Sequence, residues 1–250
     1  MLAPDFSSFV KPPKSLMRHV GRAIADFDMI HDGDRIMLGL SGGKDSLSLL
    51  SILLHLQRYA PVRFELAAMT VDPMIEGFHP EQLKPYLAEL GVPYFFEAQP
   101  IAEQAKQHMV KDSFCAFCSR IKRGIMYTTL RREGYHVLAL AQHLDDLAES
   151  FLMSVFHGGQ LKTMKANYTN KDGDIRIIRP LVYVRERQTR DFAKEANLPV
   201  VPDSCPACFG MPTQREHMKQ LLAAEEAQNP QLFKSLLTAM RPLISRHEAE

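Results

Sequence analysis

Short apolar runs alternate with longer amphipathic stretches along most of the 250-residue chain. The runs have the length of buried strands, and the stretches between them repeat apolar positions at helical spacing. The predicted strands cover residues 34–40, 64–71, 94–97, 136–141 and 175–180. The predicted helices cover residues 14–30, 47–56, 80–90, 101–110, 119–132, 143–156 and 186–196. We expect a polar loop over 158–173 and, from 213 to 246, two helices broken near Asn229-Pro230.

Strands that alternate with helices at this spacing predict an α/β fold. The sheet should be doubly wound and mainly parallel, with helices covering both of its faces. The ligand site of such a sheet lies outside the carboxyl ends of the strands, where the strand order reverses. The segments that follow the predicted strands are therefore the places to search for functional residues.

Composition and charge narrow the class of protein. The chain is 46% hydrophobic and 24% charged, which excludes a largely disordered protein. Its formal net charge of +1 excludes nucleic-acid binding through bulk electrostatics, although not through a local basic face. No apolar run approaches the roughly 18 residues that a membrane helix needs, and the N-terminus lacks the order of a signal peptide. We therefore expect a cytoplasmic protein without membrane contact.

The hexapeptide Ser-Gly-Gly-Lys-Asp-Ser joins the first predicted strand to the following helix. Two glycines let backbone N–H groups approach an oxyanion, and the helix N-terminus adds its dipole. The serines add hydroxyl groups, the lysine a positive charge for phosphate, and the aspartate a carboxylate for Mg²⁺. An ordinary strand-to-helix turn is the alternative. The residues predicted to bind the nucleotide are Ser41, Gly42, Gly43, Lys44, Asp45 and Ser46.

A second polar motif, Ala-Gln-His-Leu-Asp-Asp-Leu-Ala-Glu over residues 141–149, follows the fourth predicted strand. Asp145, Asp146 and Glu149 are candidates to place Mg²⁺ or to shape the active centre. The alternative is an acidic first helical turn, which the helix dipole favours in any case. For His143 the alternative is a packing histidine. The neighbouring nucleotide loop favours the catalytic interpretation.

The four cysteines form two C-x-x-C pairs, Cys115 with Cys118 and Cys205 with Cys208. In a large chain without an export signal, this usage favours metal or redox chemistry over a disulfide scaffold. Two such pairs can converge on one metal centre. Structural zinc and unmetallated core thiols are the alternatives.

Basic side chains gather in two regions. The first cluster consists of Arg120, Lys122, Arg123, Arg131 and Arg132. The second consists of Lys162, Lys165, Lys171, Arg176, Arg179, Arg185, Arg187 and Arg190. Such clusters can contact RNA phosphates with an affinity that falls with salt, and a solvated helix face is the alternative.

These motifs together resemble a known family. The hexapeptide is the signature of the PP-loop ATP pyrophosphatases, and residues 141–149 resemble their G-H-x-x-D-D-x-x-E motif. A cysteine pair that opens a basic helix, Phe-Cys-Ala-Phe-Cys-Ser-Arg-Ile-Lys-Arg-Gly over 114–124, resembles the tRNA 2-thiocytidine synthetases, the TtcA family. Residues 25–30, residues 178–181 and a late C-x-x-C followed by Gln214-Arg215 resemble them too. The resemblance extends from about residue 14 to residue 243.

The resemblance implies an ATP-dependent, iron–sulfur-dependent tRNA sulfurtransferase with a Rossmann-like PP-loop fold. ATP and Mg²⁺ would serve to adenylate a cytosine in the anticodon loop, and sulfide held by a 4Fe-4S cluster would then replace the activated oxygen. The implied catalytic residues are Lys44, Asp45, Asp145 and Asp146. The implied cluster ligands are Cys115, Cys118 and Cys208, with Cys205 as the alternative third ligand.

The implied partners are tRNA and a sulfur donor such as a cysteine desulfurase, and a homodimer is left open. The resemblance also suggests three parts: an N-terminal arm and helix over 1–30, the PP-loop ATP-binding domain with the first cysteine pair over 31–203, and a helical tail with the second pair over 204–250. Two alternatives stay open. One is a PP-loop adenylating enzyme that acts on another base or a small molecule, and the other is a zinc-bearing RNA-binding protein.

Overall fold

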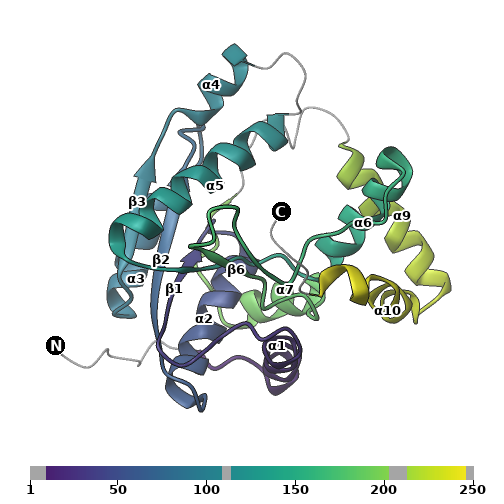
Figure 1. Cartoon of the computed structure of the whole chain (residues 1–250), viewed down its shortest axis with the longest axis horizontal. Helices are drawn as coiled ribbons and strands as arrows, with labels where there is room; N and C mark the ends of the chain where they lie inside the picture. The colour runs from purple at the N-terminus through teal and green to yellow at the C-terminus, as the bar shows by residue number, and fades with distance from the viewer. Residues whose placement is uncertain (1–9, 109–113, 203–212, 246–250) are drawn as a thin grey trace.

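A six-stranded sheet forms the centre of the computed structural model, which describes residues 10–108, 114–202 and 213–245 (Figure 1). The strand order is β3-β2-β1-β4-β6-β5. The strands are β1 (Asp34–Gly39), β2 (Phe64–Asp72), β3 (Tyr94–Ala98), β4 (Val137–Ala139), β5 (Asn167–Thr169) and β6 (Arg176–Ile178). All neighbours pair in parallel except β5 and β6. This confirms the predicted doubly wound, mainly parallel α/β sheet.

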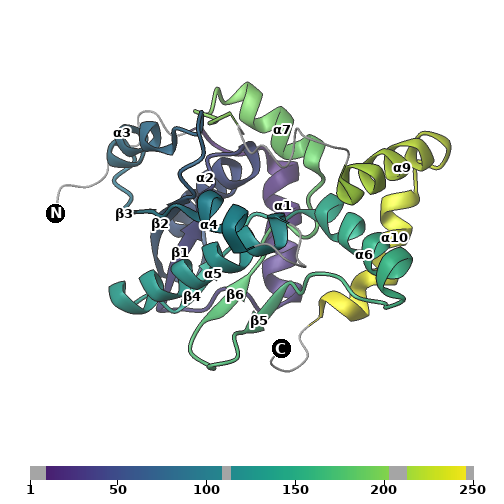
Figure 2. The same cartoon turned by 90° about the horizontal axis from the view of Figure 1, so that it is seen from above.

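Helices cover both faces of this sheet, as Figures 1 and 2 show. One layer contains α4 (Ile101–His108) and α5 (Phe114–Glu133). The other contains α1 (Lys14–Asp26), α2 (Lys44–Tyr59), α3 (Leu83–Glu89), α6 (Leu144–Gly158) and α7 (Glu186–Glu195). The C-terminal helices α9 (Gln214–Gln228) and α10 (Leu232–Ile244) lie beside α6 in both views.

The central strand β1 is apolar from Ile36 to Leu38 because both of its faces are covered there. Successive strand residues point to opposite sides of the sheet. Ile36 and Leu38 accordingly join the core that includes α1 and α2, whereas Met37 joins the core that includes Leu130 of α5. All four side chains are fully buried. A strand between two helical layers therefore reads as a continuous apolar run, as the sequence does here.

Several helix boundaries differ from the prediction for local reasons. The first helix ends at Asp26 rather than at residue 30, because Asp28 adopts a left-handed conformation with φ of 50°. The Met29 N–H then bonds to the Ile24 carbonyl, which is a common way to end a helix. The predicted helix over 80–90 is a 3-10 turn, η1 (Pro80–Gln82), followed by α3. The basic helix begins at Phe114, so Cys115 and Cys118 both belong to α5.

The polar loop predicted over 158–173 is wrong in part, because it contains the strand β5. Asn167, Tyr168 and Thr169 pair with Ile178, Ile177 and Arg176 in antiparallel register. A three-residue strand at the edge of a sheet is too short to show an alternating apolar pattern. The segment forms a strand only because it pairs with β6. The helices α9 and α10 confirm the predicted tail, with the break at Asn229-Pro230.

The strand order places the site. The chain passes from β1 to β2 on one side and later returns to β4 on the other side of β1. The order therefore reverses between β1 and β4, and the segments that follow these two strands meet at the same edge of the sheet. Within the described ranges, no helix is both long and apolar enough to cross a lipid bilayer.

Candidate active site

The hexapeptide forms the turn from β1 into α2, at the point where the strand order reverses. Gly42 has φ of 84°, and a Cβ atom there would lie 2.9 Å from Val201, so only glycine fits without strain. Gly43 is the N-cap of α2, and no described side chain caps the first amide groups of this helix. The loop therefore presents backbone N–H groups and the positive end of the helix dipole to an anion.

Lys44 lies at the start of α2, with Nζ 3.0 Å from Asp45 Oδ2 and 2.9 Å from Glu186 Oε1. Lys219 of α9 contacts the other oxygen of Glu186 at 2.8 Å. Burial raises the pKa of Glu186, but the two ammonium groups outweigh it and bring the pKa to about 2. Burial lowers the pKa of Lys44, and the two carboxylates more than offset this. Lys44 is therefore positively charged at neutral pH and is aligned by α7.

His143 connects the two motifs. It is the N-cap of α6 and is buried, and its Nδ1 accepts the backbone N–H of Asp146 at 3.3 Å. With Nδ1 as the acceptor, a proton lies on Nε2, which is 3.8 Å from Asp45 Oδ2. The Asp146 carboxylate accepts the His143 backbone N–H at 3.0 Å. This arrangement brings the carboxylates of the first and second motifs around one imidazole ring.

Asp145 faces α7 rather than the nucleotide loop. Its carboxylate lies 3.1 Å from the Arg185 guanidinium and accepts the Glu186 backbone N–H at 2.8 Å. Arg185 also contacts Glu226 of α9 at 2.6 Å and lies over the Phe233 ring of α10, 3.2 Å from its centroid. Asp145 thus ties α6 to α7, and through Arg185 to the C-terminal helices.

Glu149 lies one turn after Asp146 on α6 and is 5% exposed. Burial and the nearby Asp146 carboxylate raise its pKa to about 7. Arg215 at the start of α9 lies 3.2 Å from Asp146 and 3.8 Å from Glu149. The segment after the second cysteine pair therefore contributes a cation to the acidic motif.

Comparison with known proteins agrees with this geometry. The model of a family described as a PP-loop domain matches residues 14–226. A tRNA-cytidine(32) 2-sulfurtransferase of Geobacter sulfurreducens is 43% identical over 91% of this chain and 89% of its own length. The enzyme of that name from Idiomarina loihiensis is 40% identical over 100% of this chain and 83% of its own length.

The chain belongs to the tRNA-cytidine(32) 2-sulfurtransferase family of PP-loop proteins. This confirms the predicted family, the class of enzyme and the ATP-binding domain. The solved U34-tRNA thiolase NcsA of Methanococcus maripaludis, described with its 4Fe-4S cluster, has a TM-score of 0.78. It is 23% identical and covers 94% of this chain and 79% of that chain, so the likeness concerns the fold.

The predicted cysteine ligands of this family member are described only in part. Cys118 is half-buried near the start of α5 and packs against the second core cluster, which includes Leu130. Cys115 lies three residues earlier on α5, a spacing that puts both residues on one helix face. The Cys115 side chain, Cys205 and Cys208 lie outside the described residues.

The structure divides the predicted basic clusters. Arg131 pairs with Asp172 and Asp174, and Arg132 pairs with Glu97 and Glu133, so these two serve structural contacts. In the second cluster, Arg176 pairs with the buried Asp34, and Arg185 is enclosed between Asp145 and Glu226. Acidic side chains thus hold all four, which disfavours them as RNA-binding side chains.

Sequence reasoning missed three residues that complete the site. Glu186 and Thr189 of α7 hold Lys44 and Asp45, and Lys219 of α9 holds Glu186. These residues belong to no motif, and only the packing of α7 and α9 brings them to the loop. The sole sequence signal for any of them was the Gln214-Arg215 pair of the family resemblance, which lies one turn before Lys219 on α9.

Proposed function

We propose that the chain is an ATP-dependent tRNA sulfurtransferase that converts a cytidine of the anticodon loop to 2-thiocytidine. The observation that carries this proposal is the convergence of both motifs at the switch point of the sheet. Lys44, the amide groups that open α2, and the Asp45 and Asp146 carboxylates surround one place next to His143. A triphosphate with its cation requires this combination of donors and acceptors.

The first chemical step is adenylation of the base. The C2 carbonyl oxygen of cytosine attacks the α-phosphorus of ATP, and the bond from that phosphorus to its bridging oxygen breaks. Pyrophosphate leaves with the electron pair. Lys44 and the loop amides stabilise the charge that develops on it, which is typically a large part of such catalysis. In the second step a sulfide attacks C2 and the carbonyl oxygen leaves as part of AMP.

Asp45 and Asp146 are the residues that would hold Mg²⁺ together with the ATP phosphates. Within the described residues, no three His, Cys, Asp or Glu side chains form a ready metal cluster. This fits Mg²⁺, which proteins usually bind through one or two carboxylates plus substrate phosphates. Asp145 has the different role of a positioning residue, since Arg185 and the Glu186 amide occupy its oxygens.

Cys115, Cys118 and Cys208 are the proposed ligands of a 4Fe-4S cluster, with Cys205 as the alternative third ligand. The surroundings of Cys118 fit such a group, because its side chain is half-buried among apolar residues at one end of α5. When bound, the cluster would supply the sulfide that replaces the activated oxygen. The three thiolates would hold the cluster, and a sulfur donor such as a cysteine desulfurase is the second proposed partner beside tRNA. A cytoplasmic location and a homodimer also belong to this proposal.

The test is tRNA thiolation by protein purified without oxygen, with pyrophosphate release, iron and labile sulfide measured on the same preparation. Lys44→Ala should reduce tRNA-dependent pyrophosphate release at least a hundredfold while its iron content stays at the wild-type value. Lys194→Ala, the same change at an exposed position of α7, is the control and should keep full activity. Cys118→Ala should lose both iron and thiolation but still bind ATP.

Thiolation of a uridine, or amide formation on a small molecule, would favour the first alternative enzyme. One bound zinc ion, no iron and no pyrophosphate release would favour the RNA-binding protein. Either result would refute the proposed reaction.

A further inference from the structure

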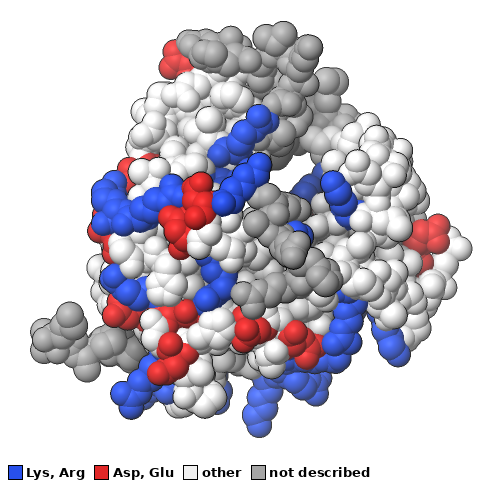
Figure 3. Space-filling view, in the orientation of Figure 1, with Lys and Arg blue, Asp and Glu red and all other residues white. Residues whose placement is uncertain are grey.

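A cavity of about 290 Å³ lies between α5, α6 and the segment that leads into β5. We call it the basic pocket and define it by Arg123, Ser150, Ser154, Lys162, Lys165 and Arg179. Figure 3 shows a hollow between the layer that contains α5 and the part that contains α6 and α9, with Lys and Arg side chains on its rim. The volume is near the lower end of the range for small-ligand pockets, about 300–1,000 Å³, so it suits one nucleotide-sized group.

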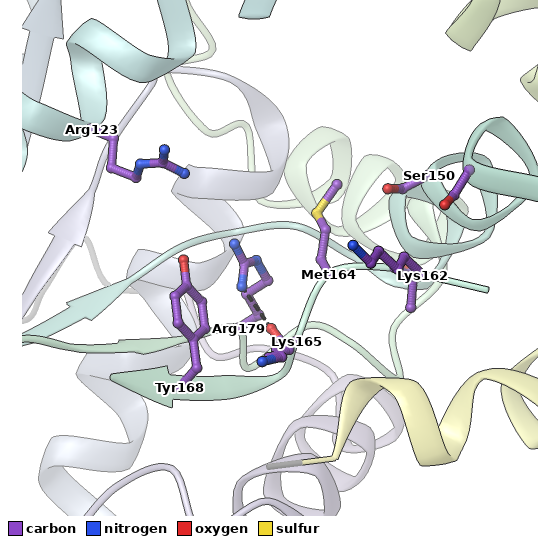
Figure 4. Close-up of a pocket in the computed structure, with 9 residues that line it drawn as sticks. Arg123, Ser150, Lys162, Met164, Lys165, Tyr168 and Arg179 are labelled. Carbon is purple, nitrogen blue, oxygen red and sulfur yellow. Dashed lines mark hydrogen bonds between the residues drawn. The ribbon is translucent and has the colours of Figure 1, made fainter. Parts of the chain in front are cut away.

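The lining of the basic pocket has one sign of charge. Four of the nine lining residues are Lys or Arg, and none is Asp or Glu. Figure 4 shows Arg123 and Lys162 pointing towards Arg179 from opposite sides. No carboxylate of the described residues forms an ion pair with Arg123 or Lys162, in contrast to Arg131 and Arg132 farther along α5. Arg123 and Lys162 thus bring to the pocket positive charge that no described carboxylate neutralises.

Arg179 is the decisive residue because it is only 8% exposed. Its Nε donates to Gln142 Oε1 at 2.9 Å and its Nη1 donates to the Lys165 carbonyl at 2.6 Å. The guanidinium also lies 5.5 Å from the centroid of the Tyr168 ring. These partners are all uncharged. A buried guanidinium without a counter-charge is costly, so the arrangement favours an anion as the missing partner.

Gln142 connects the basic pocket to the active site. It directly precedes His143, whose ring lies next to Asp45, Asp145 and Asp146. The amide group that fixes Arg179 is thus part of the same short segment that caps α6. A ligand in the pocket is therefore anchored beside the reaction centre, while the triphosphate has its own anion site at the start of α2.

We propose that the basic pocket binds one backbone phosphodiester of the RNA strand that carries the target base. This inference rests on the proposed function, since it identifies how the same active site holds its RNA. The phosphate oxygens would accept hydrogen bonds from Arg123, Arg179 and the serine hydroxyls, and Lys162 would add its charge. Such contacts set the position of a strand without reading its sequence.

The experiment measures binding of a synthetic anticodon stem-loop RNA in which single phosphodiesters are replaced by neutral methylphosphonates. Fluorescence anisotropy gives the dissociation constant for each RNA with each protein. At one position the replacement should weaken binding to wild-type protein about tenfold, yet leave binding to Arg123→Ala unchanged. The slope of the logarithm of the binding constant against the logarithm of the salt concentration should be about one unit shallower for Arg123→Ala than for the wild type.

Two further variants complete the design. Gln142→Glu places a carboxylate against Arg179 and should weaken RNA binding about tenfold without removing any cation. Arg131→Ala removes the same charge as Arg123→Ala from the same helix, but from a side chain held by Asp172 and Asp174, and should bind every RNA as the wild type does. Circular dichroism confirms that each variant is folded.

The inference is overturned if every replacement that weakens wild-type binding weakens Arg123→Ala and Gln142→Glu by the same factor. Thiolation measured on the same proteins separates it from the proposed function. If one methylphosphonate weakens binding to the wild type but not to Arg123→Ala, and no thiolation is seen, the phosphate site is supported and the proposed reaction is refuted. If thiolation is seen but no methylphosphonate distinguishes the wild type from Arg123→Ala, the proposed reaction is supported and the phosphate site is refuted.

Discussion

The carboxyl group of Glu149 should make the stability of this protein fall as the pH rises from 5 to 8. Glu149 is 5% exposed, and burial together with Asp146 raises its pKa to about 7. In the unfolded chain the same group titrates near its ordinary value of 4.5. Between these two values the folded protein keeps a proton that the unfolded chain has released, so stability decreases with increasing pH.

The size of the effect follows from the two pKa values. A shift of one unit corresponds to about 1.4 kcal/mol, so the difference between 4.5 and about 7 costs roughly 3 kcal/mol once the group is ionised. The part of this loss that falls between pH 5 and pH 8 is roughly 2–3 kcal/mol. Glu149→Gln cannot ionise, so the variant should escape the loss.

Urea unfolding at several pH values between 5 and 8, in metal-free buffer with EDTA, measures the free energy of unfolding for both proteins. The stability of Glu149→Gln relative to the wild type should increase by roughly 2–3 kcal/mol across this range and level off above pH 7. Glu225→Gln makes the same substitution at an exposed position of α9 and should show no such trend. A constant difference between Glu149→Gln and wild type at all pH values would refute the reasoning.

Two substitutions probe the loop and its support. Gly42→Ala places a Cβ atom 2.9 Å from Val201 at φ of 84°, so it should lower the free energy of unfolding by roughly 1–3 kcal/mol and weaken ATP binding. Gly21→Ala, which has open space in α1, is the control and should not destabilise the protein. Equal stability of both variants in urea unfolding would contradict this. Glu186→Gln leaves Lys44 and Lys219 without their shared carboxylate and should reduce tRNA-dependent pyrophosphate release about tenfold with unchanged RNA affinity; full activity would show that Lys44 does not need α7 for alignment.

Local signals in the chain were enough to predict five of the six strands and both motifs, whereas β5 was missed. Apolar runs such as the one around Met37 can only be buried between two layers, so these five strands and their mainly parallel direction follow from the pattern, whereas the strand order does not. The residue types and spacing around Gly42 and within residues 141–149 predict a nucleotide loop and an acidic active-site motif. The part boundaries at residues 30 and 203 and the choice between Cys205 and Cys208 stay predictions.

Tertiary structure alone decided which charged residues serve the site. In the sequence, four arginines of the basic clusters have the same charge, and their spacing does not show which of them has an acidic partner: Arg123, Arg131, Arg179 and Arg185. Packing gives Arg131 and Arg185 acidic partners from distant segments but leaves Arg179 buried against neutral acceptors. The charge of a side chain is a property of one residue, whereas its neutralisation depends on neighbours that only the folded chain brings within about 4 Å. For that reason the sequence alone determined the nucleotide loop, while the supporting residues Glu186 and Lys219 and the basic pocket required the fold.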